Sequence, residues 1–498
     1  MSAPPPRDDE MDDSPELVDA DEVLEEIEDV EGDVAMDSDD GDDDMDEPQE
    51  IHMVNDSIAY FDAHKDSVFT IAQHPTLPSL IATGGSDGDG DDAPGMGYVF
   101  DTSGVSGRPV LPPSYATDPS QATQKNTELT PLFALEGHTD SINAVAFTLP
   151  RGEYLVSGGL DGRLRAYQLA IDGHNKAKLN FVGEAQEVPE INWVAPCPYA
   201  ATPNTIALGG SDGSVWVYTI DASDKSNPLQ IVQTYFMHTG ACTAGAWSPD
   251  GLLLATVSED SSLCVWDVWG EAAAKGLTND NGQTVVSLTG EDQRFEVEGG
   301  LYSVAIDPKS TLVAVGGAGG AIKIVGLPRL NNETAPQAQP QSSRQSKTKA
   351  KGGDAGSSQA GTILASLHTQ GDGIETLSFS PSQSLLAAGS VDGSIAVYDM
   401  TKSFAVRRHL REAHEEFSVV KVDFVKGNDG WILTSCGMDG VVRRWDLRIA
   451  GQNTSGLVKE WRGHRGDGEG GGVLGFVQGT GDRVVTAGDD GIVLVFEA

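Results

Sequence analysis

The stretches LTSCGMDGVVRRWD (residues 433–446) and LAAGSVDGSIAVYD (residues 386–399) share one pattern of alternating apolar and polar residues around an Asp-Gly corner. Alternation on both sides of a tight turn is typical of two hairpin-linked β-strands, because glycine takes the positive φ of the turn at no steric cost. The sequence is therefore predicted to be built from repeated β-hairpins. Eight copies of the pattern occur, with the corner residues Asp87, Asp161, Asp212, Asp260, Gly319, Asp392, Asp439 and Asp490.

The spacing of these copies indicates the architecture. Asp212 and Asp260 lie 48 positions apart, and Asp392 and Asp439 lie 47 apart. Both spacings approach the length of one four-stranded blade of a β-propeller. We therefore predict an all-β fold, an eight-bladed WD40 β-propeller. The copy around Gly319 lacks the corner Asp, so a seven-bladed ring is the alternative if that copy is only a loop.

The two ends of the propeller are predicted to meet. Residues 493–496 supply a third strand for blade eight, and the sequence leaves no residues for a fourth. Residues 57–61 read as a short strand just before blade one. We expect this strand to become the outer strand of blade eight, because closure removes an exposed sheet edge.

Several blades carry a histidine, a hydroxyl residue, the corner Asp and an aromatic residue at matching positions. In WD-repeat proteins, which this pattern resembles, the four form a buried hydrogen-bonded chain. A hydrolytic triad is the alternative, but the recurrence of the set from blade to blade favours a structural role. The sets are His138, Ser157, Asp161 and Tyr167; His238, Thr256, Asp260 and Trp266; and His414, Ser435, Asp439 and Trp445.

Charge divides the chain of 498 residues into two unequal parts. The net charge is −44, and residues 1–50 hold 24 Asp or Glu against the single Arg7. A segment with this many charges cannot bury enough apolar surface to fold alone. Residues 1–55 are therefore predicted to be an acidic disordered tail. Residues 56–498 are assigned to the propeller, and residues 328–361 to a disordered loop between blades five and six. Residues 102–130 are expected to join blades one and two, and residues 89–97 to lengthen a turn of blade one.

The composition also excludes several classes of function. We find no nucleotide-binding loop, no metal-type cysteine spacing and no nucleophile elbow, so we predict no cofactor, no metal site and no enzymatic activity. No signal peptide or membrane span is evident, and the four cysteines are expected to be free thiols. The acidic balance argues against direct nucleic-acid binding, because phosphates would be repelled. It favours a monomer that binds a basic protein segment.

The expected binding surface is the top face, which we define as the Asp-Gly corners together with the loops that lead into each first strand. Acidic residues cluster there, and Tyr302, Trp193 and Phe69 are placed to stack on arginine. Asp140, Glu187 and Glu190 extend the acidic side toward blades two and three. The predicted partner-binding residues are Glu375, Asp489, Glu259, Asp372, Glu415, Glu416, Asp467, Glu469, Asp66, Tyr302 and Trp193.

Three segments give the chain a family resemblance: FDAHKDSVFTIAQHP (residues 61–75), EGHTDSINAVAF (residues 136–147) and SDGSVWVY (residues 211–218). With the acidic head, they resemble the eukaryotic family called angio-associated migratory cell protein in animals. Its fungal members are the dedicated chaperone of ribosomal protein L-ten, the universal large-subunit protein sixteen. The resemblance covers residues 50–498.

This resemblance implies a function and a site. Members capture the newly made ribosomal protein by its basic N-terminal segment, laid across an acidic propeller top, and keep it soluble until it joins the cytoplasmic pre-60S particle. It implies that Glu375 and Asp489 form the main salt bridges to the client. A cytoplasmic location follows, with a nuclear one left open by Lys347, Lys349 and Lys351.

Two other classes of protein stay open. A histone-binding protein or general WD-repeat scaffold would also use an acidic ring and tail. A substrate receptor of a ubiquitin ligase would need a docking motif for the ligase core, and the sequence contains no convincing one.

Overall fold

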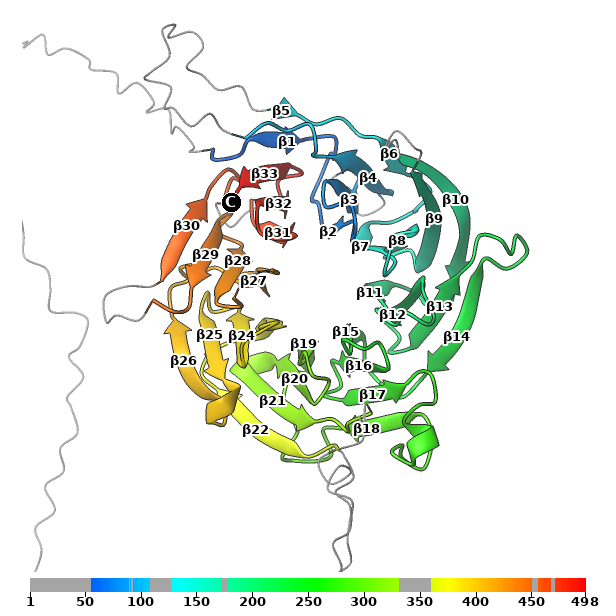
Figure 1. Ribbon diagram of the computed structural model, residues 1–498, viewed down its shortest axis with the longest axis vertical. Coiled ribbons are helices and arrows are strands. Elements are labelled where there is room, and N and C mark those ends of the chain that lie inside the picture. Colours follow the sequence, from blue (N-terminus) through cyan, green and yellow to red (C-terminus); the bar gives the residue numbers. More distant parts are fainter. Residues whose placement is uncertain are drawn as a thin grey trace, which may run out of the picture. The chain divides into compact units, whose positions relative to one another are not determined.

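The computed structural model describes residues 55–88, 90, 93–107, 127–171, 177–330, 360–427, 429–449, 456–466 and 471–498. They form eight sheets arranged as the blades of a ring (Figure 1). The predicted eight-bladed propeller is therefore confirmed, and the copy around Gly319 is a complete blade, blade five. The predicted tail, apart from Asn55, lies outside the described residues, so its boundary stays a prediction.

Each blade runs from its innermost strand, at the centre of the ring, to its outermost strand at the circumference (Figure 1). Blade one comprises β2 (Thr70–Gln73), β3 (Leu80–Ser86), β4 (Gly95–Asp101) and β6 (Phe133–Leu135). Blade two comprises β7 (Ile142–Phe147), β8 (Tyr154–Gly159), β9 (Arg163–Ile171) and β10 (Ala177–Gln186). Blade three comprises β11 (Ile191–Pro196), β12 (Thr205–Gly210), β13 (Val215–Ile220) and β14 (Leu229–Tyr235). Blade four comprises β15 (Cys242–Trp247), β16 (Leu253–Ser258), β17 (Leu263–Asp267) and β18 (Thr284–Leu288).

The second half of the ring follows the same order. Blade five comprises β19 (Leu301–Ile306), β20 (Leu312–Gly317), β21 (Ala321–Gly326) and β22 (Ile363–His368). Blade six comprises β23 (Ile374–Phe379), β24 (Leu385–Ser390), β25 (Ile395–Asp399) and β26 (Ala405–Leu410). Blade seven comprises β27 (Val419–Phe424), β28 (Ile432–Gly437), β29 (Val442–Asp446) and β30 (Leu457–Trp461). Blade eight comprises β31 (Val473–Val477), β32 (Arg483–Gly488), β33 (Val493–Glu497), β1 (Ala59–Phe61) and β5 (Thr127–Glu128).

Helical structure is scarce in the described part of the chain. It is limited to the 3-10 turns η3 (Ala273–Lys275), η4 (Ala318–Gly320) and η5 (Met400–Lys402). No helix there has the length and apolar character needed to cross a membrane.

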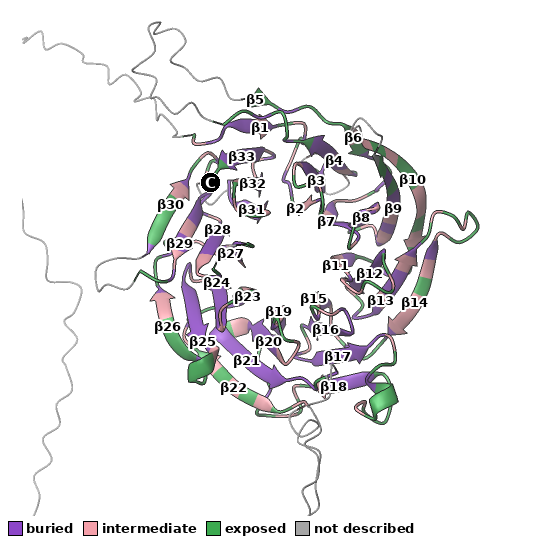
Figure 2. Ribbon diagram, viewed as in Figure 1, coloured by how far each residue is buried: buried purple, intermediate pink, exposed green. Residues whose placement is uncertain are grey.

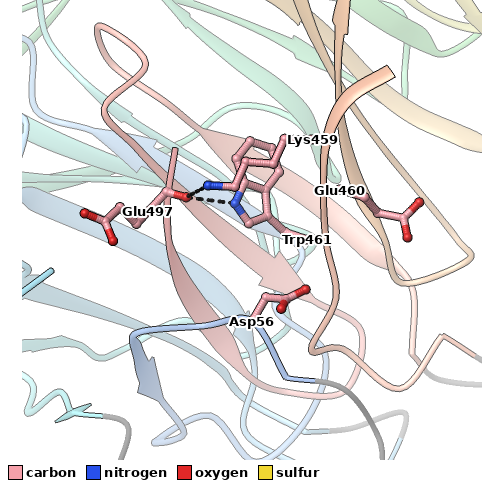
Figure 3. A pocket seen from close by; sticks show the side chains of 5 residues that line it. All are labelled: Asp56, Lys459, Glu460, Trp461 and Glu497. Atoms are coloured by element: carbon pink, nitrogen blue, oxygen red, sulfur yellow. Dashed lines mark hydrogen bonds between the residues drawn. The ribbon is translucent and has the colours of Figure 1, made fainter. Parts of the chain in front are cut away.

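The N-terminal strand closes the ring as predicted. β1 pairs antiparallel with β33, and Ala59 lies opposite Val495. At the neighbouring seam with blade seven, the Trp461 Nε1 and Lys459 Nζ atoms each donate a 2.8 Å hydrogen bond to the Glu497 carbonyl (Figure 3). Asp56 lies beside them and accepts a 3.0 Å bond from the Arg462 amide. These contacts fasten the C-terminal strand between blade seven and the first described residues.

The insertions differ from the sequence-based expectation. Residues 102–130 connect the third and fourth strands of blade one, and within them β5 adds to blade eight, parallel to β1. Residues 328–361 connect the third and fourth strands of blade five, so they do not separate blades five and six. Gly95 already begins β4, so the turn insertion in blade one is shorter than expected. Lys347, Lys349 and Lys351 lie outside the described residues.

The core lies between neighbouring blades. Figure 2 shows buried residues concentrated on the middle strands of the blades, such as β21 and β25, whereas outermost strands such as β26 and β30 carry many of the exposed positions. Strands β8, β12, β16 and β24 are buried at every residue. Side chains from adjacent blades share one cluster, as Val397 of blade six and Leu433 of blade seven do. All four cysteines are buried and free, as expected.

Candidate functional site

The top face is built by corners that bond to the residues just before the first strands. The amide of Glu259, at the corner of blade four, donates a 3.1 Å bond to the Ala241 carbonyl. The amide of Asp489, at the corner of blade eight, donates a 2.9 Å bond to the Gly472 carbonyl. Equivalent bonds recur from blade two to blade eight, so each corner side chain stands beside the beginning of an innermost strand.

A β-bulge follows at the second residue of the innermost strand in blades two to eight. In β23, for example, Ile374 pairs with Ser390 and Thr376 with Gly389, which leaves Glu375 unpaired. Such a bulge re-aims its side chain. Phe69 holds the same position in blade one, directly before Thr70, which pairs with Gly84. The resulting bulge ring consists of Phe69, Asn143, Asn192, Thr243, Tyr302, Glu375, Val420 and Leu474.

Glu375 is the acidic member of this bulge ring. Its side chain is exposed, and it forms no ion pair with any lysine or arginine among the described residues. Partial desolvation, assisted by the nearby carboxylate of Asp372, raises the pKa of Glu375 above its usual value of 4.5. A carboxylate in this state is stabilised by an incoming cation. Glu375 is therefore prepared to bind a basic side chain.

Asp489 is held in place from the neighbouring blade. Its Oδ1 atom accepts a 2.6 Å hydrogen bond from the hydroxyl of Ser67, which precedes β2 of blade one. The Ser67 amide in turn donates a 2.8 Å bond to Oδ1 of Asp66, so Asp66 and Asp489 stand at the same junction. Both carboxylates are only half-buried, and they present acid to the top face between blades eight and one.

The other predicted acids occupy the same face. Glu259, Asp372, Glu415 and Glu416 are exposed. The structure therefore brings the predicted acids of blades four, six, seven, eight and one around one face. Asp467 and Glu469 lie outside the described residues.

The two predicted aromatic contacts differ. Tyr302 is 36% exposed at its bulge, and its hydroxyl donates a 2.5 Å bond to the Gly299 carbonyl. Trp193 lies directly after the bulge of β11, and its indole covers Gly209 and Gly245 between blades three and four. Trp193 is thus engaged in packing, so Tyr302 and Phe69 are the aromatic side chains that the bulge ring exposes.

The histidine sets are hydrogen-bonded, with one complete example in blade seven. His414 bonds Asp439 through Nδ1 at 2.9 Å and Ser435 through Nε2 at 2.8 Å, and the Trp445 indole donates to Ser435 at 2.9 Å. All four residues are buried. Their side chains satisfy one another within the sheet, which agrees with a structural role.

Two of the predicted sets depart from this arrangement. In blade two, His138 bonds Asp161 and Ser157, but the Tyr167 hydroxyl donates to the Glu136 carbonyl instead of completing the chain. A tyrosine hydroxyl extends beyond the place that an indole N–H fills.

In blade four, His238 bonds Thr256 at 2.8 Å, and the Trp266 indole donates to the same hydroxyl. The Nδ1 atom of His238 contacts Ser262, which in turn bonds Asp260, so a serine is inserted between His and Asp. Burial lowers the pKa of His238 to about 4, which keeps the ring neutral at pH 7.

The opposite end of the innermost strands has a different character. A cavity of about 530 Å³ lies there, with walls from blades one, two, three, seven and eight. Lys421 and Lys426 line it together with a single acid, Asp423. The acidic surface is therefore a property of the top face and does not extend to this cavity.

Comparison with known proteins agrees with the propeller fold described above. The family described as "WD domain, G-beta repeat" matches residues 129–168, 229–267 and 361–399. A crystal structure of Sqt1 from Chaetomium thermophilum is 61% identical, covers 90% of this chain and 100% of its own, and superposes with a TM-score of 0.77. This chain belongs to the Sqt1 family.

One further Sqt1 protein and one further structure of the Chaetomium thermophilum protein bear on function. Ribosome assembly protein SQT1 of Saccharomyces cerevisiae is 29% identical over 492 residues, which cover 93% of each chain. A second Chaetomium thermophilum Sqt1 structure, with a TM-score of 0.76, 61% identity and coverage of 89% and 100%, is bound to the N-terminus of ribosomal protein L10.

Proposed function

We propose that this Sqt1-family chain is a dedicated chaperone for a newly made large-subunit ribosomal protein, L10. It captures the basic N-terminal segment of L10 on its acidic top face and delivers the protein for 60S assembly. The observation that carries this proposal is the Chaetomium thermophilum Sqt1 structure bound to the N-terminus of ribosomal protein L10, at 61% identity to this chain.

The charges of the described top face support capture of a cation. Glu375 has a raised pKa and no lysine or arginine partner in the part of the chain that the structure describes, while Asp489 is oriented by Ser67. An arginine of the client placed against Glu375 would offset the cost of its desolvation and its repulsion by Asp372. The remaining exposed acids steer a basic chain toward the face before it docks.

The positions of the histidines support a protein that binds its client without catalysing a reaction. The hydrogen-bonded histidines are buried within the blades, where a substrate does not reach them. We infer that the chain acts as a monomer in the cytoplasm, without direct contact to nucleic acid. An acidic face keeps the basic segment of the client away from RNA until the ribosomal particle offers a better site.

Binding of histones is the second candidate, since an acidic face also suits a histone tail. Affinity purification of the tagged chain from its own cells separates the two candidates. Bound proteins are identified by mass spectrometry, and the messenger RNAs of co-purified ribosomes are identified by sequencing. L10 and its messenger RNA should be the dominant species. Enrichment of histones without L10 would contradict the proposal.

A further inference from the structure

The bulge ring is divided into a polar half and an apolar half. In blades three and four the bulge side chains are committed to the next blade: Asn192 donates to the Cys242 carbonyl at 3.0 Å, and Thr243 to the Leu301 carbonyl at 2.6 Å. Because these polar groups already have partners, they offer a peptide little. These two bulge residues therefore serve mainly to join neighbouring blades.

The other half of the bulge ring presents apolar side chains on both sides of one acid. We define the apolar arc as Tyr302 of blade five, Val420 of blade seven, Leu474 of blade eight and Phe69 of blade one. Glu375 of blade six lies between Tyr302 and Val420 in the order of the blades. Phe69 is 39% exposed and Tyr302 36%, so their rings are available for contact.

Two corner residues continue this apolar surface. The side chain of Val391 lies against Gly373, directly before β23. That of Met438 occupies the space that a side chain at Gly472 would need, directly before β31. Both corners are half-buried. Apolar surface therefore runs beside Glu375 from blade five to blade one, and the half-buried Asp489 adjoins its far end through Ser67.

We propose that this surface selects the class of basic segment that the chain captures. The preferred segment places one arginine or lysine against Glu375 and carries apolar or aromatic residues on both sides of it, which pack on the apolar arc. A segment of equal charge whose other residues are polar, such as Ser and Gly, leaves the arc in water and binds less tightly. The inference rests on the proposed function, because it assigns the client to this face.

Apolar contacts would allow the chain to distinguish one basic segment from another, which charge alone does not do. Long-range attraction brings any basic chain to an acidic face and fixes the rate of encounter more than the choice of partner. Apolar contacts are short-ranged and unaffected by ionic screening, so they discriminate after encounter. A chaperone that depends on both would reject lysine-rich polar tails at cellular salt.

The test uses two synthetic peptides of equal length and charge, one with Leu and Tyr between its arginines and one with Ser and Gly. They are titrated calorimetrically into the full chain and into Phe69→Ser and Tyr302→Ser. Leu160→Ser is the matched control, because Leu160 is 37% exposed at the corner of blade two, outside the arc. Melting temperatures establish that each variant is folded.

The apolar-spaced peptide should bind wild type about tenfold more tightly than the polar one, which corresponds to one well-packed side chain. Phe69→Ser and Tyr302→Ser should each lose most of this tenfold difference in affinity between the two peptides, and the loss should be the same at low and high salt. Leu160→Ser should keep the difference. Equal binding of the two peptides to wild type, or equal losses in all three variants, would overturn the inference. If Glu375→Lys with Asp489→Lys abolishes binding while the arc variants leave it unchanged, the selection is wrong and the proposed function survives. If neither set of substitutions affects binding, both are wrong.

Discussion

The hydroxyl of Ser67 donates a 2.6 Å hydrogen bond to Oδ1 of Asp489, across a separation of 422 positions in the chain. Ser67 precedes the innermost strand of blade one, and Asp489 forms the corner of blade eight. The bond therefore joins the first and last repeats at the top face, and closure of the ring positions an acid of the proposed site.

We predict that Ser67→Ala weakens binding of the L10 N-terminal peptide several-fold. The substitution frees the Asp489 carboxylate and removes a hydrogen bond worth about 1 kcal/mol of stability. Urea unfolding and peptide titration measure the two effects. Ser141→Ala, at the matching position of blade two, is the control. Indistinguishable affinities for the two variants would show that Ser67 does not orient Asp489.

Glu375 should make peptide binding sensitive to acid. Its pKa lies above 4.5 in the free protein, so lowering the pH from 7 protonates it before an ordinary glutamate, and the affinity should fall. Binding near that pH should release protons, which calorimetry in two buffers detects. Glu375→Gln should remove the proton release, and an unchanged release would contradict the assignment.

The same shift has a consequence for stability. A folded-state pKa raised above the unfolded value means that the ionised carboxylate disfavours folding above the pH window between the two values. Glu375→Gln should therefore raise the melting temperature slightly at pH 7, and this gain should vanish below about pH 4.5.

Two buried histidines should make the ring acid-labile. Burial lowers the pKa of both His64 and His238 to about 4, against 6.5 when exposed. Between these values the unfolded chain binds more protons, so the free energy of unfolding should fall as the pH drops from 6.5 toward 4. The slope is at most about 1.4 kcal/mol per pH unit for each histidine. Urea unfolding at pH 7, 6 and 5 measures this slope, and a double His64→Gln, His238→Gln variant should reduce it. A flat profile in wild type would show that these rings are not held neutral.

Truncation should separate the acidic tail from the closing strand. A chain that lacks residues 1–54 should melt close to the full-length protein, because so charged a segment has little apolar surface to contribute. A chain that lacks residues 1–61 also loses β1, which exposes the edge of β33, and should melt many degrees lower or aggregate. Thermal unfolding of the two truncated chains measures both effects. Equal melting temperatures for the two chains would refute closure by β1. A melting temperature far below that of the full-length protein in the chain that lacks residues 1–54 would show that the tail stabilises the ring.

The number of blades was predictable from sequence, because each copy of the corner pattern marks one hairpin and a hairpin of this kind belongs to one blade. Outer strands were harder. β6 has three residues and β22 follows a long insertion, so neither carries a pattern that assigns it to the preceding corner. The insertions were consequently placed between blades. β5 was missed because a strand of two residues is too short to show an alternating pattern.

The acids of the top face were also predictable, since position relative to a corner determines the face. The bulges were not. A bulge arises from register between two strands, and Val420 and Leu474 look like ordinary strand residues in the sequence. The sequence also gives no sign of the bulge at Asn192. Because of this bulge, the side chain of Trp193 packs between blades three and four and not on the top face, where we expected it.

The proposed function requires a basic segment of L10 to bind the acidic top face through Glu375 and Asp489. We would measure this binding by titrating the L10 N-terminal peptide at two salt concentrations. The proteins titrated are wild type, the double variant Glu375→Lys with Asp489→Lys, and Asp140→Lys. Loss of a desolvated acid that faces arginine should cost about 2–5 kcal/mol, so the double reversal should abolish binding while the ring stays folded. Asp140→Lys should be milder, and wild-type affinity should fall as the screening length shortens to about 8 Å near physiological salt. Binding by the double reversal as tight as wild type, or affinity independent of salt, would contradict the account.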